Sequence, residues 1–174
     1  MKILVTYFSQ TGNTRQIANA IHCEILKKQD CELIALENIH PEDLTKYHMI
    51  VVGSPIHAGG LAAQVTAFLD SIPNDPGFTM AAFVTHAASV YDTASFDKGV
   101  KAFEASAAKK NIPFKGIFSC QGKLTIELHD SVKASKKISD DEWEKRKAEF
   151  SQHPNAEDEK MASAFARKII EDGT

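Results

Sequence analysis

The sequence contains few cysteines, and none of them lie in a metal-binding or disulfide pattern. Cys23, Cys31 and Cys120 form no C-x-x-C pair and are odd in number, which favours a reducing, cytoplasmic environment over a disulfide framework. The seven histidines include no H-x-x-x-H pair. We therefore predict no metal site, because zinc ligands usually come at such spacings.

The chain also lacks an excess of positive charge. It has 20 Lys and Arg against 23 Asp and Glu, a formal net charge of -3, whereas general nucleic-acid and membrane-surface binders are basic. No apolar run approaches the length of a membrane span. A strand-like segment follows Met1 at once, without the ordered regions of a secretion signal. We expect no nucleic-acid or membrane partner and a cytoplasmic location.

Several nucleotide motifs are missing. The sequence has no G-x-x-x-x-G-K-[ST], and no G-x-G-x-x-G follows the first predicted strand. A response-regulator receiver would need acidic residues after the first strand and an aspartate after the third, where Tyr7, Phe8, Gly53 and Ser54 stand instead. These three classes of protein are excluded.

What the sequence does have is an alternation of short apolar runs with segments of helical period. Its 174 residues, 43% hydrophobic, suit one domain over residues 1–174. Alternation of this kind predicts an α/β fold with a doubly wound parallel sheet. The segments 49–53 and 81–84 show no polar alternation, as expected for strands covered on both faces. The predicted strands are 3–8, 32–36, 48–53, 80–85 and 114–120.

Apolar residues at helical spacing predict the core faces of the connecting helices. The first helix spans about 13–28, and Pro41 begins only a short helix in the second connection. The predicted core stripes are Ile17, Ile21 and Ile25; Leu61, Val65, Phe68, Leu69 and Ile72; Phe96, Val100, Phe103 and Ala107; and Met161, Phe165 and Ile169.

The segment from about 121 to 152 is too long for an ordinary loop and predicts a structured insertion before the last helix. Ser139 and Glu142 form a capping-box pattern, flanked by Ile138 and Trp143 at hydrophobic-staple positions. We therefore expect a helix at about 140–150. For Trp143, anchoring of the insertion to the body is favoured over contact with a ligand.

The loop after the first strand has the composition of a phosphate site. Ser9, Thr11 and Thr14 supply hydroxyl donors, and Gly12 permits a close turn. The backbone amides of Gln10, Gly12 and Asn13 lie where a helix begins and presents unpaired N–H groups to an anion. An ordinary helix cap is the alternative, but a cap needs one such hydroxyl and not three. We expect Arg15 to point away along the helix surface, adding only a diffuse positive field.

The segment YFSQTGNT resembles the flavin mononucleotide (FMN) phosphate loop of flavodoxins, Ser/Thr-x-Thr-Gly-x-Thr, at every fixed position. VVGSPIHAGG and FVTHAASVY resemble, by position, the two loops that flank the isoalloxazine ring. The likeness covers about 1–122 and resumes at His153. A branch of small flavodoxin-domain proteins from anaerobic microbes is similar in a further feature, the segment GIFSCQGKL followed by a helical insertion and then by HPNAEDEKMASAFARKI. The resemblance implies a five-stranded parallel sheet in the order 2-1-3-4-5.

In a doubly wound sheet the ligand lies where the strand order reverses, here between the first and third strands. The three loops would converge there. Pro55 would supply rigidity, Gly59 and Gly60 would supply backbone freedom, and Tyr91 would stack on the ring. Two alternatives stay open: the two glycines could form a plain turn of a strand-to-helix connection, and His57 could either cover the ring or face solvent. The resemblance implies no catalytic residue and these FMN-binding residues: Ser9, Gln10, Thr11, Gly12, Asn13, Thr14, Ser54, Pro55, Ile56, His57, Ala58, Gly59, Thr85, His86, Ala87 and Tyr91.

The functional hypothesis is an electron-transfer protein that passes electrons between redox enzymes through bound FMN and meets its protein partners transiently. One alternative is an FMN-dependent NAD(P)H:quinone or nitro-compound reductase, for which the insertion could form a lid. A second alternative is a cofactor-free binding module on the same fold. The carrier is favoured because no second nucleotide motif or acid-base constellation is present. The oligomeric state is left open.

Overall fold

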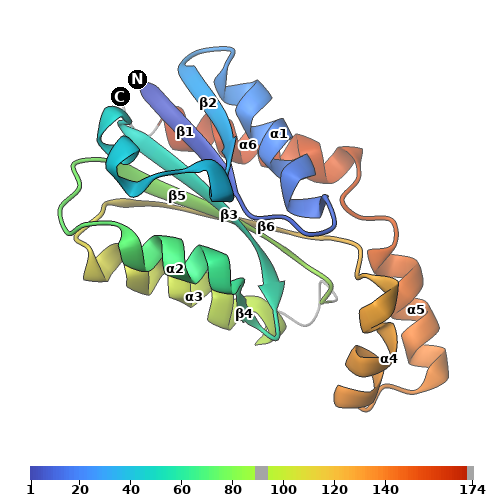
Figure 1. The fold of residues 1–174 in the computed structure, drawn as a ribbon. Helices are drawn as coiled ribbons and strands as arrows, with labels where there is room; N and C mark the ends of the chain where they lie inside the picture. Colours follow the sequence, from blue (N-terminus) through green and yellow to red (C-terminus); the bar gives the residue numbers. More distant parts are fainter. Residues whose placement is uncertain (89–93, 172–174) are drawn as a thin grey trace.

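The fold is a parallel sheet between two layers of helices (Figure 1). The computed structural model describes residues 1–88 and 94–171. The main strands run in the order β2-β1-β3-β5-β6 and pair in parallel, while the short β4 pairs antiparallel with β3. This confirms the predicted parallel sheet and its strand order. The strands are β1 (Lys2–Tyr7), β2 (Asp30–Ala35), β3 (Met49–His57), β4 (Gly60–Leu61), β5 (Thr79–His86) and β6 (Phe114–Gln121).

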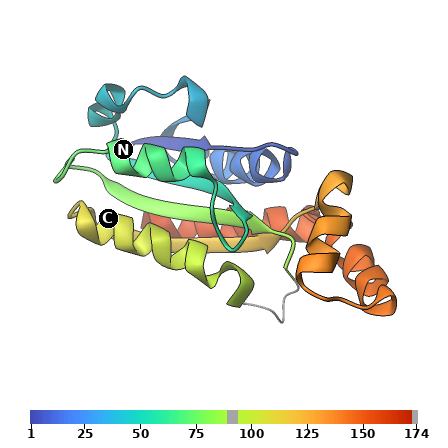
Figure 2. The same cartoon turned by 60° about the horizontal axis from the view of Figure 1, so that its bottom comes forward.

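Helices cover both faces of the sheet, α1 and α6 on one side and α2 and α3 on the other (Figures 1 and 2). The second connection contains only two short 3-10 turns, as Pro41 predicted. The helical elements are α1 (Asn13–Ile25), η1 (Leu36–Asn38), η2 (Pro41–Lys46), α2 (Ala63–Ser71), α3 (Ala94–Lys109), α4 (Ile126–Ser135), α5 (Asp140–Phe150) and α6 (Ala156–Glu171).

Side-chain alternation along the strands divides the core in two. In β1, Ile3 and Val5 face the α1 and α6 layer, while Leu4 faces the α2 and α3 layer. All three are fully buried, as expected for a strand covered on both faces.

The α1 stripe is confirmed, because Ile17, Ile21 and Ile25 are all fully buried. Full burial of each such side chain stabilises the fold by about 1.5–3 kcal/mol. The α6 stripe is wrong at Met161, which is 53% exposed. The buried face of α6 combines Ala162 and Ala166 with Ile169 and Ile170, so Ile169 is confirmed and Met161 lies one position off the buried stripe.

The third crossover contains a hairpin that the sequence did not predict. β3 continues to His57 and turns back through Ala58 and Gly59 into β4. Ala58 and Gly59 have φ of 50° and 82°, the consecutive left-handed pair that a tight two-residue hairpin requires. The predicted freedom at Gly59 is confirmed. Gly60 is not among the residues of positive φ, so the turn does not need glycine there.

The insertion lies beyond the carboxyl ends of the strands, at the right of Figure 1. The predicted α5 is confirmed, and Ser139 Oγ accepts a hydrogen bond from the Glu142 amide at 3.3 Å. The Glu142 carboxylate contacts Arg146 instead of returning to the cap. Trp143 is buried and packs edge-on against His129 and Phe150, so it holds α5 against α4 within the insertion.

The helix α4 was not predicted, because none of its residues is buried and its sequence has no apolar stripe. Ile126, at its start, is 81% exposed.

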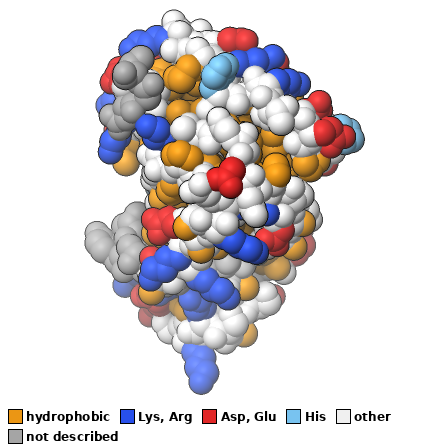
Figure 3. Space-filling view, turned by 90° about the vertical axis from the view of Figure 1, so that its left-hand side faces the viewer, with side chains coloured by type: hydrophobic (Ala, Val, Ile, Leu, Met, Phe, Trp, Pro, Cys, Tyr) orange, Lys and Arg blue, Asp and Glu red, His pale blue; other side chains and the backbone are white. Residues whose placement is uncertain are grey.

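Charges of both signs are interspersed over the face that Figure 3 presents, which is the left-hand side of Figure 1. This agrees with the small net charge of -3. Among residues 1–88 and 94–171, no helix is long and apolar enough to cross a membrane.

Candidate functional site

Three predicted loop segments meet at one edge of the sheet. They follow β1, β3 and β5, which are neighbours, with Tyr7 paired to Gly53 and Pro55 to Thr85 in the strand register. The segments 9–14, 54–59 and 85–87 therefore lie side by side at the carboxyl ends of the strands, the usual position of ligands in open α/β sheets. Tyr91, the predicted stacking ring, lies outside the described residues.

The first segment turns into α1 through Gly12, whose φ of 91° is left-handed. Ser9 Oγ accepts hydrogen bonds from the Gly12 amide at 3.2 Å and the Arg15 amide at 3.3 Å. Ser9 thus caps the start of α1 with its side chain. For this one hydroxyl, the alternative of an ordinary helix cap is confirmed. The Thr11 side chain is exposed, and its hydroxyl makes no hydrogen bond with the described residues.

Thr14 occupies a different environment from Thr11. Its side chain is 1% exposed, and its Oγ1 lies 2.9 Å from Oγ1 of Thr85, which is also buried. This hydrogen bond joins the start of α1 to the end of β5. The three predicted phosphate hydroxyls therefore play three distinct parts, with Ser9 capping the helix, Thr11 open and Thr14 bridging two segments.

The Asn13 side chain is directed to the end of β6. Its Nδ2 donates to the Lys123 carbonyl at 2.8 Å. Gly122 leaves room for this contact, since a Cβ there would lie 2.8 Å from Asn13 Nδ2. The link between the first loop and the segment after β6 was not predicted from the sequence.

The expectation for Arg15 is wrong. Its guanidinium curls back over the loop, with Nη2 4.0 Å from the place where a Cβ on Gly12 would lie. Ser9, Gln10, Thr11 and Arg15 line the same hollow of about 290 Å³ beside the loop. The curl is explained by the open space above Gly12, which has no side chain. Arg15 makes no ion pair with the described residues, so its positive charge is available beside the loop.

The second segment is held mainly by Ser54. This residue is fully buried, its Oγ donates to the Pro55 carbonyl at 2.8 Å, and it accepts from the Ala62 amide at 3.1 Å. Ser54 thereby fixes the start of α2. Ile56 packs into the core, and a Cβ at Gly99 of α3 would lie 2.4 Å from Ile56 Cδ1. The hairpin is thus seated directly on α3.

The exposed part of the second segment is its turn, from His57 to Gly59. Although the His57 ring is exposed, the surrounding protein desolvates it enough to lower its pKa from the ordinary value. The turn backbone and this imidazole are the groups that the segment can offer to a ligand.

The third segment is ordered around His86, which is 7% exposed. Its ring stacks on Phe96 at a centroid distance of 4.0 Å and an interplanar angle of 11°. Burial lowers the pKa of His86 to about 4, against the opposing effect of its contact with the Ala88 carbonyl. A neutral imidazole then donates from Nδ1 to Ala88 O at 3.2 Å. Phe96 was predicted as a core residue; its partner proves to be His86.

Sequence reasoning also missed Gln121, the last residue of β6. Its Nε2 lies 2.9 Å from both Ala88 O and Glu149 Oε1, so it joins the end of β5 to the insertion. The only signal in the sequence was a polar residue, followed by glycine, at the end of a buried strand.

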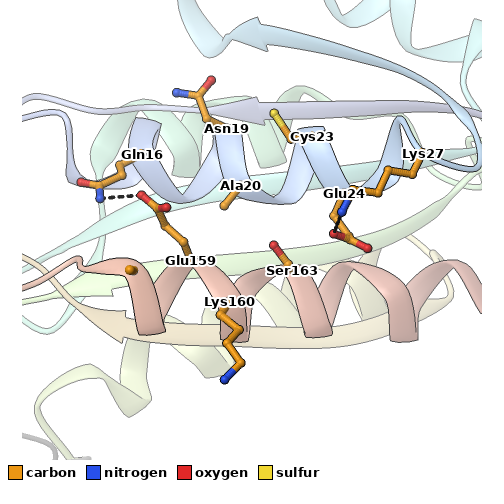
Figure 4. A pocket seen from close by; sticks show the side chains of 10 residues that line it. Gln16, Asn19, Ala20, Cys23, Glu24, Lys27, Glu159, Lys160 and Ser163 are labelled. Carbon is orange, nitrogen blue, oxygen red and sulfur yellow. Dashed lines mark hydrogen bonds and ion pairs between the residues drawn. The ribbon is translucent and has the colours of Figure 1, made fainter.

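A larger hollow, of about 500 Å³, lies between α1 and α6 (Figure 4). Several of its polar residues are paired with one another, with Gln16 donating to Glu159 at 2.8 Å and Glu24 bound by Lys27 at 2.6 Å. Lys27, first, and then Arg167 lower the pKa of Glu24. This hollow does not include the convergent loops. Within residues 1–88 and 94–171, no group of His, Cys, Asp and Glu could hold a metal ion.

The sheet order and the glycine-turned hydroxyl loop define a flavodoxin-like α/β protein. A family model described as "Flavodoxin domain" matches residues 4–167. The chain therefore belongs to the flavodoxin-domain family.

A curated relative from Clostridioides difficile (strain CD3), the flavodoxin-like domain-containing protein BilS, is 29% identical over 175 residues, which cover 98% of this chain and 97% of BilS. Two solved structures are similar along their whole length. Flavodoxin 1 from Bacillus cereus has a TM-score of 0.68 at 18% identity, with 98% of each chain covered. A short-chain flavodoxin associated with a non-canonical PDU bacterial microcompartment has a TM-score of 0.70 at 14% identity, covering 100% of this chain and 99% of that one.

A larger protein also contains a similar fold. The rubredoxin oxygen:oxidoreductase of Desulfovibrio gigas has a TM-score of 0.68 at 13% identity, covering 98% of this chain. This chain spans only 35% of the length of that oxidoreductase, so the likeness concerns one part of it. At these identities the solved structures show the fold alone.

Proposed function

We propose that the protein binds FMN without a covalent bond and carries electrons between larger redox proteins. The observation that carries the proposal is the Ser9–Thr14 loop, which opens α1 through a left-handed Gly12. The first turn of α1 has no acidic residue, which favours an anion at the positive end of the helix dipole, and the one carboxylate among the residues that line the adjoining hollow, Glu37, is accompanied there by Arg15.

The residues present fit the phosphate of FMN. The open Thr11 hydroxyl and those amides of the turn that Ser9 Oγ does not bind are neutral donors, and the Arg15 guanidinium adds a positive charge beside them. Hydrogen bonds to a charged group are stronger than those between neutral groups. The exposed turn at His57–Gly59 and the ordered segment at His86–Ala87 are the groups suited to flank the ring. When bound, the flavin supplies the transfer of one or two electrons, and the protein supplies its binding and orientation.

A carrier is favoured over a turnover enzyme because segments 9–14, 54–59 and 85–87, the described part of the site, contain no acid-base pair of side chains. The polar side chains at the three segments are neutral hydroxyls, two amides and two imidazoles, and the pKa of His86 lies far below neutrality. Support for a carrier also comes from membership of the flavodoxin-domain family. We further propose a single domain over residues 1–174, transient protein partners and a cytoplasmic location.

The test begins with the visible absorption spectrum of the purified protein, followed by denaturation and fluorescence to identify the released flavin. The proposal expects yellow protein that releases FMN. Steady-state oxidation of NADH or NADPH with a quinone then separates carrier from reductase. Slow turnover with stoichiometric reduction of a protein acceptor is expected; fast turnover would replace the carrier by the reductase. If the purified protein does not bind added FMN, the remaining alternative is a cofactor-free binding module on the same fold.

A further inference from the structure

Residues Gln121, Gly122 and Lys123 form a joint between β6 and the helical insertion, and this joint contacts two of the proposed flavin-binding segments. The Lys123 carbonyl accepts from Asn13 Nδ2 at 2.8 Å. The Gly122 amide donates to the His86 carbonyl at 2.9 Å. One short stretch of backbone therefore touches both the loop after β1 and the end of β5.

The Gln121 side chain extends the joint to α5. It is 3% exposed, and its single amide nitrogen donates to Ala88 O and to Glu149 Oε1, at 2.9 Å each. Ala88 follows β5, and Glu149 lies in the last turn of α5. A single amide thus links the residue that follows the third segment to the helical insertion.

The orientation of this amide is fixed by its neighbours. Turning it over would place Oε1 against a carbonyl and a carboxylate, both of which are acceptors. As it stands, Oε1 is buried without a hydrogen-bond partner among the described residues. A buried acceptor left unpaired is unfavourable, so the side chain is held in place by what its nitrogen binds.

We propose that Gln121 is a positioning residue that couples the helical insertion to the flavin environment, by fixing Ala88 to Glu149. The proposal rests on the proposed FMN site. Glu149 precedes Phe150, which packs with Trp143 in the contact that holds α5 against α4. Displacement of α5 is therefore passed through Glu149 and Gln121 to Ala88, whose carbonyl also receives the His86 imidazole.

The primary test replaces Gln121 by methionine, which has similar length and no donor. Gln152→Met is the matched control, because Gln152 is an exposed glutamine at the end of α5 whose Nε2 donates to the Ala148 carbonyl. Amide hydrogen exchange of the free protein is measured at residues 86–88. Loss of two hydrogen bonds should speed exchange there by roughly tenfold or more in Gln121→Met, while Gln152→Met should match the parent protein.

The second arm uses the FMN-loaded protein and measures its visible spectrum and reduction potentials. A shift in potential separates positioning from bulk destabilisation, since global loss of stability changes the melting temperature without changing the bound flavin. A tenfold difference in affinity between two oxidation states corresponds to about 59 mV for one electron. We expect a measurable shift in Gln121→Met and none in Gln152→Met.

Changes at Glu149 test the coupling from the insertion side. Glu149→Gln keeps an oxygen acceptor and should keep parent-like exchange at residues 86–88. Glu149→Leu removes one of the two bonds of Gln121 and leaves the other, to Ala88 O, in place, so it should speed exchange in the same direction as Gln121→Met but by less. Glu149 is only half buried, so both variants should fold even if Gln121→Met does not.

Parent-like exchange and potential in both Gln121→Met and Glu149→Leu would overturn the coupling. A parent protein that binds no FMN would overturn the proposed function instead, and the exchange measurements on free protein would still decide whether the link between α5 and Ala88 exists.

Discussion

Thr11 and Thr14 have the same side chain and belong to the same predicted motif, yet the structure predicts opposite consequences for their replacement by valine. The Thr11 hydroxyl is exposed and makes no hydrogen bond with the described residues. The Thr14 hydroxyl is buried and bonds Thr85 at 2.9 Å. Valine preserves the shape of threonine and removes only the hydroxyl, so each substitution isolates one polar contact.

The expected magnitudes follow from these contacts. Thr14→Val leaves the buried Thr85 hydroxyl without this partner, and such an unsatisfied group costs about 1–3 kcal/mol of the free energy of unfolding. In a protein of this size, that loss lowers the melting temperature by roughly 2–12 °C. Thr11→Val removes no internal contact and should change the free energy of unfolding by less than about 0.5 kcal/mol.

The assay is urea unfolding of the FMN-free proteins, followed by titration of each with FMN. Thr11→Val should keep parent-like stability and lose affinity for FMN. Thr14→Val should lose stability, and Thr85→Val in the same background should add less than its own single effect, because both partners of one bond are then gone. Equal stability losses in Thr11→Val and Thr14→Val, or fully additive losses at Thr14 and Thr85, would refute this assignment.

Three further outcomes are expected. Gly53→Ala should destabilise the protein by about 1–3 kcal/mol or more in urea unfolding, since its Cβ would lie 2.1 Å from the Phe83 ring and overpack the core; an unchanged unfolding midpoint would contradict this packing. Burial lowers the pKa of His86 to about 4 in the folded protein, whereas the same imidazole has a pKa of about 6.5 when the chain is unfolded. As pH falls below about 6.5 the unfolded state therefore binds a proton that the folded state does not, and roughly 3 kcal/mol of the free energy of unfolding should be lost by pH 4. His86→Phe, which keeps a ring against Phe96, should flatten that part of the pH profile of stability, and an unaltered profile would reject the buried neutral imidazole. Alkylation of the native protein should modify Cys23 first, because it is exposed while the other two cysteines are buried; peptide mapping that finds equal labelling would contradict this.

The sheet could be predicted because its determinants are local. Continuous apolar runs such as 49–53 mark strands buried on both faces, and the Ile17, Ile21 and Ile25 spacing marks one face of a helix. The hairpin at 56–61 could not be predicted in this way, since it depends on a left-handed Ala58 and on the close approach of Gly99 to Ile56. Neither leaves a periodic signal in the sequence.

The candidate site, like the fold, was predictable where it depends on neighbouring residues and not where it depends on contacts between distant ones. Its hydroxyl loop is contiguous, and Gly12 proved left-handed as the turn required. The contacts that tie this loop to the rest of the site join residues far apart in sequence, as in Thr14 with Thr85 and Asn13 with Lys123. Arg15 was misplaced because the helical period indicates the face on which a residue starts but not the direction in which a long, flexible side chain folds.

The most direct test of the FMN proposal is a comparison of FMN with riboflavin, which lacks the phosphate, as ligands for the flavin-free protein. If the Ser9–Thr14 loop and Arg15 hold the phosphate, FMN should bind at least about a hundredfold more tightly, since two or more hydrogen bonds to a charged group contribute about 1.5–3 kcal/mol each. Thr11→Val should narrow this ratio. Equal affinities for the two flavins would contradict the phosphate assignment.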